Sequence, residues 1–146
     1  MTNKKLKLYL DDVRTPTDPE WIVARNYDEF VNIVLKIGID SFEVISLDHD
    51  LGDTAMKEYF NNVAPNYQLN YENITEKTGL DCAKWLIEHF LTTNNETNNF
   101  NFPLIYTHSA NPIGSANIMG YVNNFLKNMR KNESCIRVKI QHTINH

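Results

Sequence analysis

Three short apolar runs in this chain have one feature in common: titratable side chains follow each of them. The runs are Leu6 to Leu10 before Asp11 and Asp12, Phe42 to Leu47 before Asp48, His49 and Asp50, and Leu104 to Tyr106 shortly before His108 and Ser109. Continuous apolar runs of this length are typical of buried strands. The carboxyl ends of parallel strands meet at one edge of a sheet, where ligands bind. The pattern therefore predicts an α/β fold with one site shared by three strand ends.

Segments with apolar residues at helical spacing separate these runs. The first helix is capped at Asn26 or Asp28 and ends at Gly38, the second follows Thr78 or Asp81, and the third begins near Pro112. Two further strands are predicted at 21–25 and 135–141. Strands that alternate with helices in this order predict a mainly parallel sheet of five strands, with helices covering both of its faces.

Two segments do not fit the alternation of strands and helices. Residues 11–20 contain Pro16 and Pro19, which prevents a helix of useful length there. The stretch 53–77 is polar and reads as an insertion, with one short helix around 56–63. Its tyrosines could stack on a base, or the insertion could simply be a solvated loop.

Length and charge limit the possible classes of protein. A chain of 146 residues forms one domain with a real core, and no apolar run approaches the ~20 residues that span a bilayer. The first residues leave no room for a signal peptide before the first strand, so we expect a cytoplasmic protein. A net charge of −4 argues against a duplex nucleic-acid footprint, although not against recognition of one nucleotide end. Cys82 and Cys135 lack metal-ligand spacing, and we expect them to be buried thiols that do not form a disulfide.

The carboxylates at the strand ends are candidate metal ligands. If Asp11, Asp12, Asp48 and Asp50 converge at one edge of the sheet, a cation must neutralise them or some must stay protonated. Hard carboxylate oxygens suit Mg²⁺ or Mn²⁺, and such a metal commonly takes phosphate oxygens from the substrate. The carboxylates therefore indicate phosphate chemistry.

Hydrogen-bond donors and imidazoles accompany the carboxylates. Arg14 and Ser109 could bind a phosphate, and Asn111 is a further candidate for substrate binding or else a turn residue. His49 and His108 are candidates for a general acid and base beside Asp48. Alternatively, His108 caps the third helix or binds a backbone carbonyl. The other three histidines have no acidic or histidine partner at informative spacing and are interpreted as structural or disordered.

Four strings together resemble the cyclic-phosphate processing receiver-like family, a branch of the response-regulator receiver fold. They are Leu10-Asp11-Asp12-Val13-Arg14-Thr15-Pro16, Ser46-Leu47-Asp48-His49-Asp50-Leu51-Gly52, Thr78-Gly79-Leu80-Asp81-Cys82-Ala83-Lys84-Trp85-Leu86 and His108-Ser109-Ala110-Asn111-Pro112-Ile113-Gly114. The resemblance covers nearly the whole chain apart from 53–77. It implies a flavodoxin-like, three-layer fold. Asp11 and Asp12 match the metal-binding acidic pair of receivers, Asp48 matches the phospho-accepting aspartate, and Ser109 or Thr107 matches the hydroxyl residue.

The chain also departs from the receiver pattern. The loop at 11–20 replaces the helix between the first two strands, and Lys139 lacks the proline that follows the receiver lysine, so we do not assign it that role. His49 and His108 are not expected in a signalling receiver, and they flank the positions that would hold a phosphoryl group. These departures favour an enzyme over an ordinary receiver.

The resemblance implies metal-dependent processing, by hydrolysis or ring opening, of a cyclic phosphate on a nucleotide or RNA end. The alternative is a non-catalytic module that accepts phosphate on Asp48 in signalling or binds a cyclic nucleotide without turnover. A third hypothesis is a partner-binding module that kept the site residues only for stability. The base, the ring size and the oligomeric state do not follow from the sequence.

Overall fold

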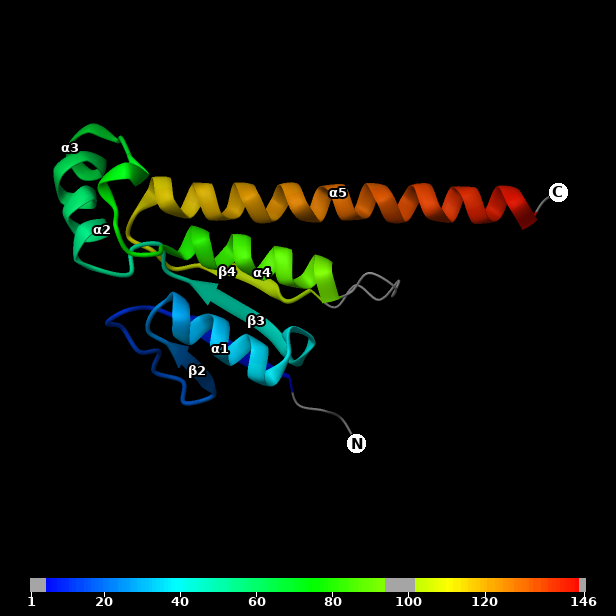
Figure 1. Cartoon of the computed structure of the whole chain (residues 1–146), viewed down its shortest axis with the longest axis horizontal. Helices are drawn as coiled ribbons and strands as arrows, with labels where there is room; N and C mark the ends of the chain where they lie inside the picture. The colour runs from blue at the N-terminus through cyan, green and yellow to red at the C-terminus, as the bar shows by residue number, and fades with distance from the viewer. Residues whose placement is uncertain (1–4, 94–101, 145–146) are drawn as a thin grey trace.

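The computed structural model describes residues 5–93 and 102–144, with side chains up to residue 129 in the last helix. Its sheet has four strands, all parallel, in the order β2-β1-β3-β4 (Figure 1). The strands are β1 (Leu6–Leu10), β2 (Trp21–Ala24), β3 (Phe42–Leu47) and β4 (Leu104–Thr107). The strand order changes direction at β1, which is the kind of switch point where α/β proteins bind ligands.

The register of the sheet brings the strand ends level with one another. Leu10 pairs with Leu47 of β3, and Leu47 pairs in turn with Thr107 of β4. The backbone pairing continues one residue further, because the Asp48 amide donates to the Leu10 carbonyl at 3.0 Å and the His108 amide donates to the Leu47 carbonyl at 3.1 Å. The first polar residue after each strand therefore lies beside its counterpart on the next strand.

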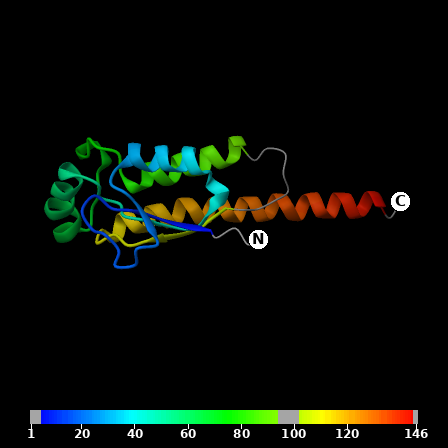
Figure 2. The same ribbon diagram turned by 90° about the horizontal axis from the view of Figure 1, so that it is seen from below.

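Three long helices pack on one face of the sheet (Figure 2). They are α1 (Tyr27–Ile37), α4 (Gly79–Thr93) and α5 (Pro112–Ile144). Asn26 caps α1 by accepting from the Glu29 amide at 2.9 Å, and Asp81 accepts from the Thr78 amide at 2.8 Å to close the first turn of α4. The capping residues predicted from the sequence are confirmed at both helices.

The hydrophobic core lies between the sheet and these helices. Alternate residues of β1 and β3, such as Leu8, Leu10 and Ile45, are fully buried against Leu86 of α4 and Ile118 of α5. Leu104 and Tyr106 point to the opposite face of the sheet and are 61% and 55% exposed. In the described part of the chain, helices thus cover one face of the sheet, and the prediction of three layers with helices on both faces is wrong there.

The receiver-like α/β architecture is confirmed, with four strands in place of the predicted five. The segment 135–141, predicted as the fifth strand, continues helix α5 to Ile144. Its alternating apolar residues imitate a strand, but no glycine or proline follows Gly120 to end the helix. A loop joins β1 directly to β2, as predicted from Pro16 and Pro19.

The stretch 53–77, predicted as an insertion, folds into short helical turns at the same end of the chain's fold as the strand ends (Figure 1). These are α2 (Asp53–Glu58), a π-helical turn (Tyr59–Val63), α3 (Ala64–Asn66) and a 3₁₀ turn (Tyr71–Asn73). The buried Glu58 carboxylate holds them together, because it accepts from the Asn70 amide at 2.9 Å and from the Asn73 side chain at 3.0 Å. The helix predicted around 56–63 is thus part of a longer helical run.

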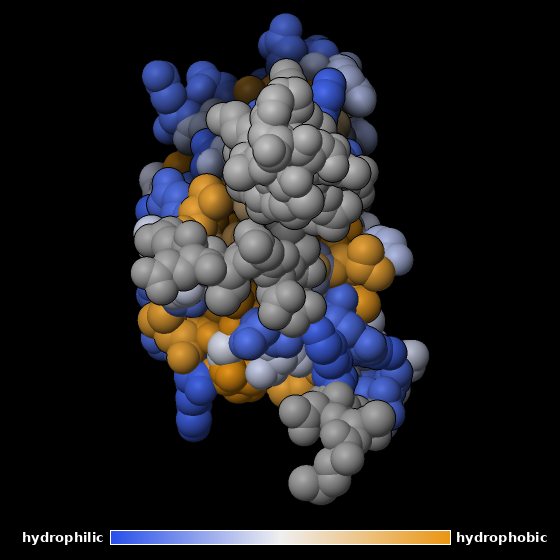
Figure 3. All heavy atoms as spheres, turned by 90° about the vertical axis from the view of Figure 1, so that its right-hand side faces the viewer, coloured by the Kyte–Doolittle hydropathy of each residue, from blue (hydrophilic) through white to orange (hydrophobic). Residues whose placement is uncertain are grey.

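The end of the domain away from the polar strand ends mixes hydrophilic and hydrophobic groups (Figure 3). A further 3₁₀ turn, Ile39–Ser41, precedes β3 there.

Among the described residues, no helix has both the length and the apolar character needed to cross a membrane. Cys82 is a buried, free thiol, as predicted, and the side chain of Cys135 lies outside the described residues.

Candidate functional site

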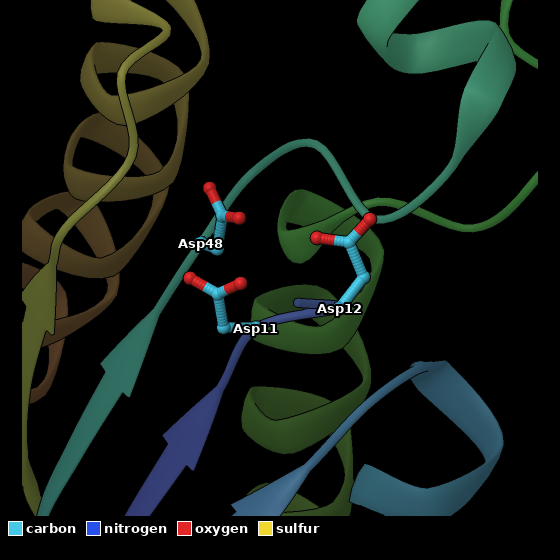
Figure 4. A group of neighbouring side chains, drawn as sticks. All are labelled: Asp11, Asp12 and Asp48. Carbon is cyan, nitrogen blue, oxygen red and sulfur yellow. The ribbon is translucent and has the colours of Figure 1, made fainter. Parts of the chain in front are cut away.

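Three carboxylates meet at the carboxyl ends of β1 and β3. Asp11, Asp12 and Asp48 each offer one oxygen atom, and these atoms lie within 4.8 Å of one another. Figure 4 shows the Asp11 and Asp48 side chains side by side at the strand ends, with Asp12 reaching in from the loop after β1. Asp50, also predicted as a metal ligand, is not in this group.

The Asp11 carboxylate is buried and accepts hydrogen bonds from every side. Its Oδ1 accepts from the backbone amides of Val13 and Arg14 at 3.0 and 2.8 Å. Its Oδ2 accepts from Arg14 Nε at 2.7 Å and lies 3.2 Å from His108 Nε2. Burial alone would raise the pKa of Asp11, but these amide bonds and the Arg14 charge hold the pKa below its ordinary value.

The pKa values of the other two carboxylates are shifted in the opposite direction, because hydrogen bonds and positive charge do not outweigh burial there. The pKa of Asp48 is raised to about 6, mainly by burial and secondly by the negative charge of Asp11. A hydrogen bond from the Ser109 side chain partly offsets this rise. Burial and the Asp11 charge also raise the pKa of Asp12. A site that raises the pKa of two carboxylates in this way favours the arrival of positive charge.

A hollow of about 270 Å³ opens beside the cluster, and we call it the strand-end hollow. Its wall combines carboxylates, a guanidinium, a hydroxyl and apolar groups from the inserted helices. The lining residues are Asp12, Val13, Arg14, Asp48, Asp50, Met56, Tyr59, Ser109 and Ala110. Four of the predicted site residues besides Asp48 therefore share one cavity.

His108 contacts the Asp11 carboxylate and does not line the strand-end hollow. Its ring stacks on Tyr9 with centroids 4.1 Å apart, and its Nδ1 lies 2.7 Å from the Ser46 hydroxyl. Because an ionised carboxylate only accepts, Nε2 carries the hydrogen toward Asp11 and Nδ1 accepts from Ser46. Burial lowers the pKa of His108, with Asp11 opposing it, which fits a neutral ring that holds Asp11 in place.

His49, predicted as a catalytic residue, is fully buried and does not reach the hollow. Its Nδ1 lies 2.6 Å from Asp50 Oδ1, and its Nε2 lies 3.0 Å from the Tyr71 hydroxyl. Both ring nitrogens are thus occupied by protein groups. Two close contacts keep His49 in this position: the Gly79 amide donates to the His49 carbonyl at 2.9 Å, and the ring lies against the backbone of Gly114 in α5.

Asn111 is the N-cap of α5 and not a group on the wall of the hollow. Its Oδ1 accepts from the Gly114 amide at 2.9 Å, and its Nδ2 donates to Asp50 Oδ1 at 3.2 Å. Its side chain is completely buried, so the interpretation as a turn residue is the one that the structure supports. Ser109, by contrast, lines the hollow and also accepts from the Asn111 amide at 3.1 Å.

Sequence reasoning missed the residues that the insertion brings to the site. Tyr71 reaches His49, while Met56 and Tyr59 form part of the wall of the hollow. The tyrosines of this stretch were the available signal, but no spacing rule places an irregular insertion over a particular strand end. Their contacts follow from tertiary packing and not from local pattern.

The donor set fits a hard divalent cation. Three carboxylate oxygens within 4.8 Å suit Mg²⁺ or Mn²⁺, and the raised pKa of Asp48 indicates a deficit of positive charge. Asp11 is the exception, because its acceptor positions are filled by protein donors. The residues therefore fit the metal when the Arg14 guanidinium releases its hydrogen bond to Asp11 Oδ2.

A parallel α/β domain with an acidic cluster at these strand ends has the fold and site of a receiver. The profile of the cyclic-phosphate processing receiver domain matches residues 6–124, and the chain belongs to this family. Comparisons with curated proteins and with solved structures give no match. The family places the chain in the context of cyclic-phosphate processing.

Proposed function

We propose that this chain opens a cyclic phosphate on a nucleotide or RNA end by hydrolysis, with the help of a divalent cation. The observation that carries the proposal is the strand-end hollow, where the carboxylates Asp12 and Asp48 face the same space as Arg14 and Ser109. Carboxylates suit a cation, whereas a guanidinium and a hydroxyl suit the oxygens of a phosphate. One cavity therefore contains both groups suited to a cation and groups suited to a phosphate, which supports the proposal.

The metal would be held by Asp11, Asp12 and Asp48, and when bound it would neutralise phosphate charge and make a water molecule more acidic. Arg14 and Ser109 donate to the phosphate oxygens and fix their orientation.

The remaining carboxylate of the hollow is available for proton transfer. In the hydrolysis, a water oxygen bonds to phosphorus and gives one proton to a carboxylate, one ester P–O bond of the ring breaks, and the released ribose oxygen takes up that proton from the carboxylate. Asp50 lines the hollow but stands outside the metal group, so we assign it to receiving the proton of the water. His49 and Asn111 position Asp50 through their hydrogen bonds, and His108 positions Asp11.

Turnover of cyclic nucleotides tests the proposal. The chain is incubated with Mg²⁺ or Mn²⁺ and a 2′,3′-cyclic or 3′,5′-cyclic nucleotide, and the phosphomonoester product is followed by chromatography. We expect Asp48→Asn to lower turnover by at least about 100-fold, because even partners of metal ligands contribute 10–100-fold. Asp40→Asn, which removes an exposed carboxylate before β3, is the matched control and keeps full activity.

Two outcomes would refute this assignment. One is the absence of product from both cyclic substrates with either metal. The other is a turnover that Asp48→Asn leaves unchanged, since the carboxylate would then have no part in the reaction.

A second candidate function is that of a receiver-like module that accepts a phosphoryl group on Asp48. The observation that favours it is the position of Asp48, which directly follows β3, lines the hollow and receives a hydrogen bond from Ser109. Acetyl phosphate labelling followed by intact-mass measurement separates the two functions. An adduct on the chain that Asp48→Asn abolishes favours the module, whereas tight binding of a cyclic nucleotide without product favours a sequestering role.

A further inference from the structure

One guanidinium joins the three strand ends that build the candidate site. Arg14 Nε donates to Asp11 Oδ2 at 2.7 Å, and one terminal nitrogen lies 3.6 Å from Asp48 Oδ2. The same terminal nitrogen donates to the backbone carbonyl of His108 at 3.0 Å. Arg14 therefore supplies positive charge to two of the three carboxylates that form the metal group.

The contact at Asp11 leaves no acceptor for another cation. An ionised carboxylate offers about four lone-pair sites, and the four donors around Asp11 fill them. The amides of Val13 and Arg14 belong to the turn after β1 and cannot leave without unfolding it. Of the two side-chain donors at Oδ2, His108 is held by its stacking on Tyr9 and its bond with Ser46, so Arg14 is the donor that can give way to a metal ion.

The Arg14 side chain can move although its backbone is held. Arg25 donates to the Arg14 carbonyl at 2.7 Å and to the Asp11 carbonyl at 3.2 Å, which fixes the loop after β1. The Arg14 side chain itself is 50% exposed, in contrast to the buried Asp11. Release of the guanidinium therefore costs side-chain contacts but no rearrangement of the loop.

We propose that Arg14 is a built-in counter-cation that competes with the divalent metal for Asp11 and Asp48, and that a phosphate in the strand-end hollow draws it away. This inference rests on the proposed function, because the metal is the one assigned there. Arg14 lines the hollow, so a phosphate offers its guanidinium a second anionic partner. Metal and phosphate then bind with positive coupling, each improving the affinity for the other.

Binding of Mn²⁺, measured from the signal of the free ion by electron paramagnetic resonance, tests the inference without any turnover. In the absence of phosphate, we expect Arg14→Gln to bind Mn²⁺ about tenfold more tightly than the unchanged chain, a coupling of ordinary size. Arg14→Lys keeps the charge and stays close to the unchanged chain. Lys36→Gln removes one exposed positive charge from the last turn of α1 and is the matched control, with an affinity within twofold.

Inorganic phosphate supplies the second arm of the experiment. Phosphate should tighten Mn²⁺ binding by a larger factor in the unchanged chain than in Arg14→Gln, because only the former has a guanidinium to displace. An equal factor in both proteins overturns the coupling.

The remaining outcomes are equally decisive. Weaker or unchanged Mn²⁺ binding by Arg14→Gln shows that Arg14 does not compete with the cation, and failure of every variant to bind Mn²⁺ overturns the inference as well. Tighter binding by Arg14→Gln, together with no turnover of cyclic nucleotides, upholds the inference and refutes the proposed hydrolysis.

Discussion

The fully buried His49 ring contacts Asp50 on the wall of the strand-end hollow, because its Nδ1 lies 2.6 Å from Asp50 Oδ1. On its other side, Nε2 reaches the Tyr71 hydroxyl, which also accepts from the Asn117 side chain at 2.9 Å. The imidazole therefore links β3 to the insertion and to α5. The buried ring therefore holds the Asp50 carboxylate in position.

Replacing His49 by alanine should destabilise the fold strongly. The substitution leaves a cavity under Gly114 and removes the partners of Asp50 and Tyr71. We expect the free energy of unfolding to fall by about 2 to 4 kcal/mol, measured by urea denaturation. Tyr71→Phe removes only one hydroxyl and should cost about 1 kcal/mol. An unchanged urea midpoint for His49→Ala would contradict the buried role.

Two glycines of α5 allow a matched test of how closely the helix approaches this ring. A methyl group on Gly114 would lie 2.3 Å from His49 Cγ, whereas nothing lies within 4 Å of the same group on Gly120. Gly114→Ala should therefore destabilise the protein by about 2 kcal/mol or more, because the ring has no space to give. Gly120→Ala should stabilise it by up to about 1 kcal/mol through helix propensity. Thermal unfolding that ranks the two variants equally would refute this packing.

Much of the fold follows from local pattern. The apolar runs that precede Asp11, Asp48 and His108 are β1, β3 and β4, and level registers then bring their polar ends together without further information. The convergence of the carboxylates was predictable for this reason. The roles of Arg14 and Ser109 as wall groups of one cavity were predictable in the same way.

The predicted fifth strand is wrong, and the positions of His49 and Asn111 did not follow from the sequence, because local pattern cannot decide between alternatives there. The apolar alternation in 135–141 predicts a strand, but helix continuation from Pro112 prevails where no breaker intervenes. A histidine beside two aspartates suggests catalysis, yet the side on which it faces depends on α4 and the insertion. Asn111 similarly precedes Pro112, and its capping geometry became visible only with the helix in place.

Loss of the Asn111 side chain should weaken the start of α5. Asn111→Ala removes the acceptor for the Gly114 amide and one donor to Asp50. We expect a loss of about 1 to 3 kcal/mol in the free energy of unfolding by urea denaturation. Asn124→Ala, at an exposed position of the same helix, should stay within about 0.5 kcal/mol of the unchanged chain. Equal effects of the two substitutions would argue against the cap.

The pKa of Asp48 links the stability of the metal-free protein to pH. Burial and the Asp11 charge raise the pKa of Asp48 from its ordinary 3.8 to about 6. Between these two values the folded state binds more protons at this residue than the unfolded state, so stability falls as pH rises through the interval. The stabilisation is complete below about pH 4 and lost above about pH 6.

Asp48→Asn should remove this dependence, because an amide of the same size carries no charge at any of these values. Above pH 6 we expect the variant to be more stable than the unchanged chain by about 1 to 3 kcal/mol, and at pH 4 the two should be nearly equal. Urea denaturation from pH 4 to pH 8 with a chelator present measures the difference. Asp40→Asn serves as the control for a carboxylate outside the cluster. A stability difference that does not grow between pH 4 and pH 6 would show that the Asp48 carboxylate is not strained by burial and by Asp11.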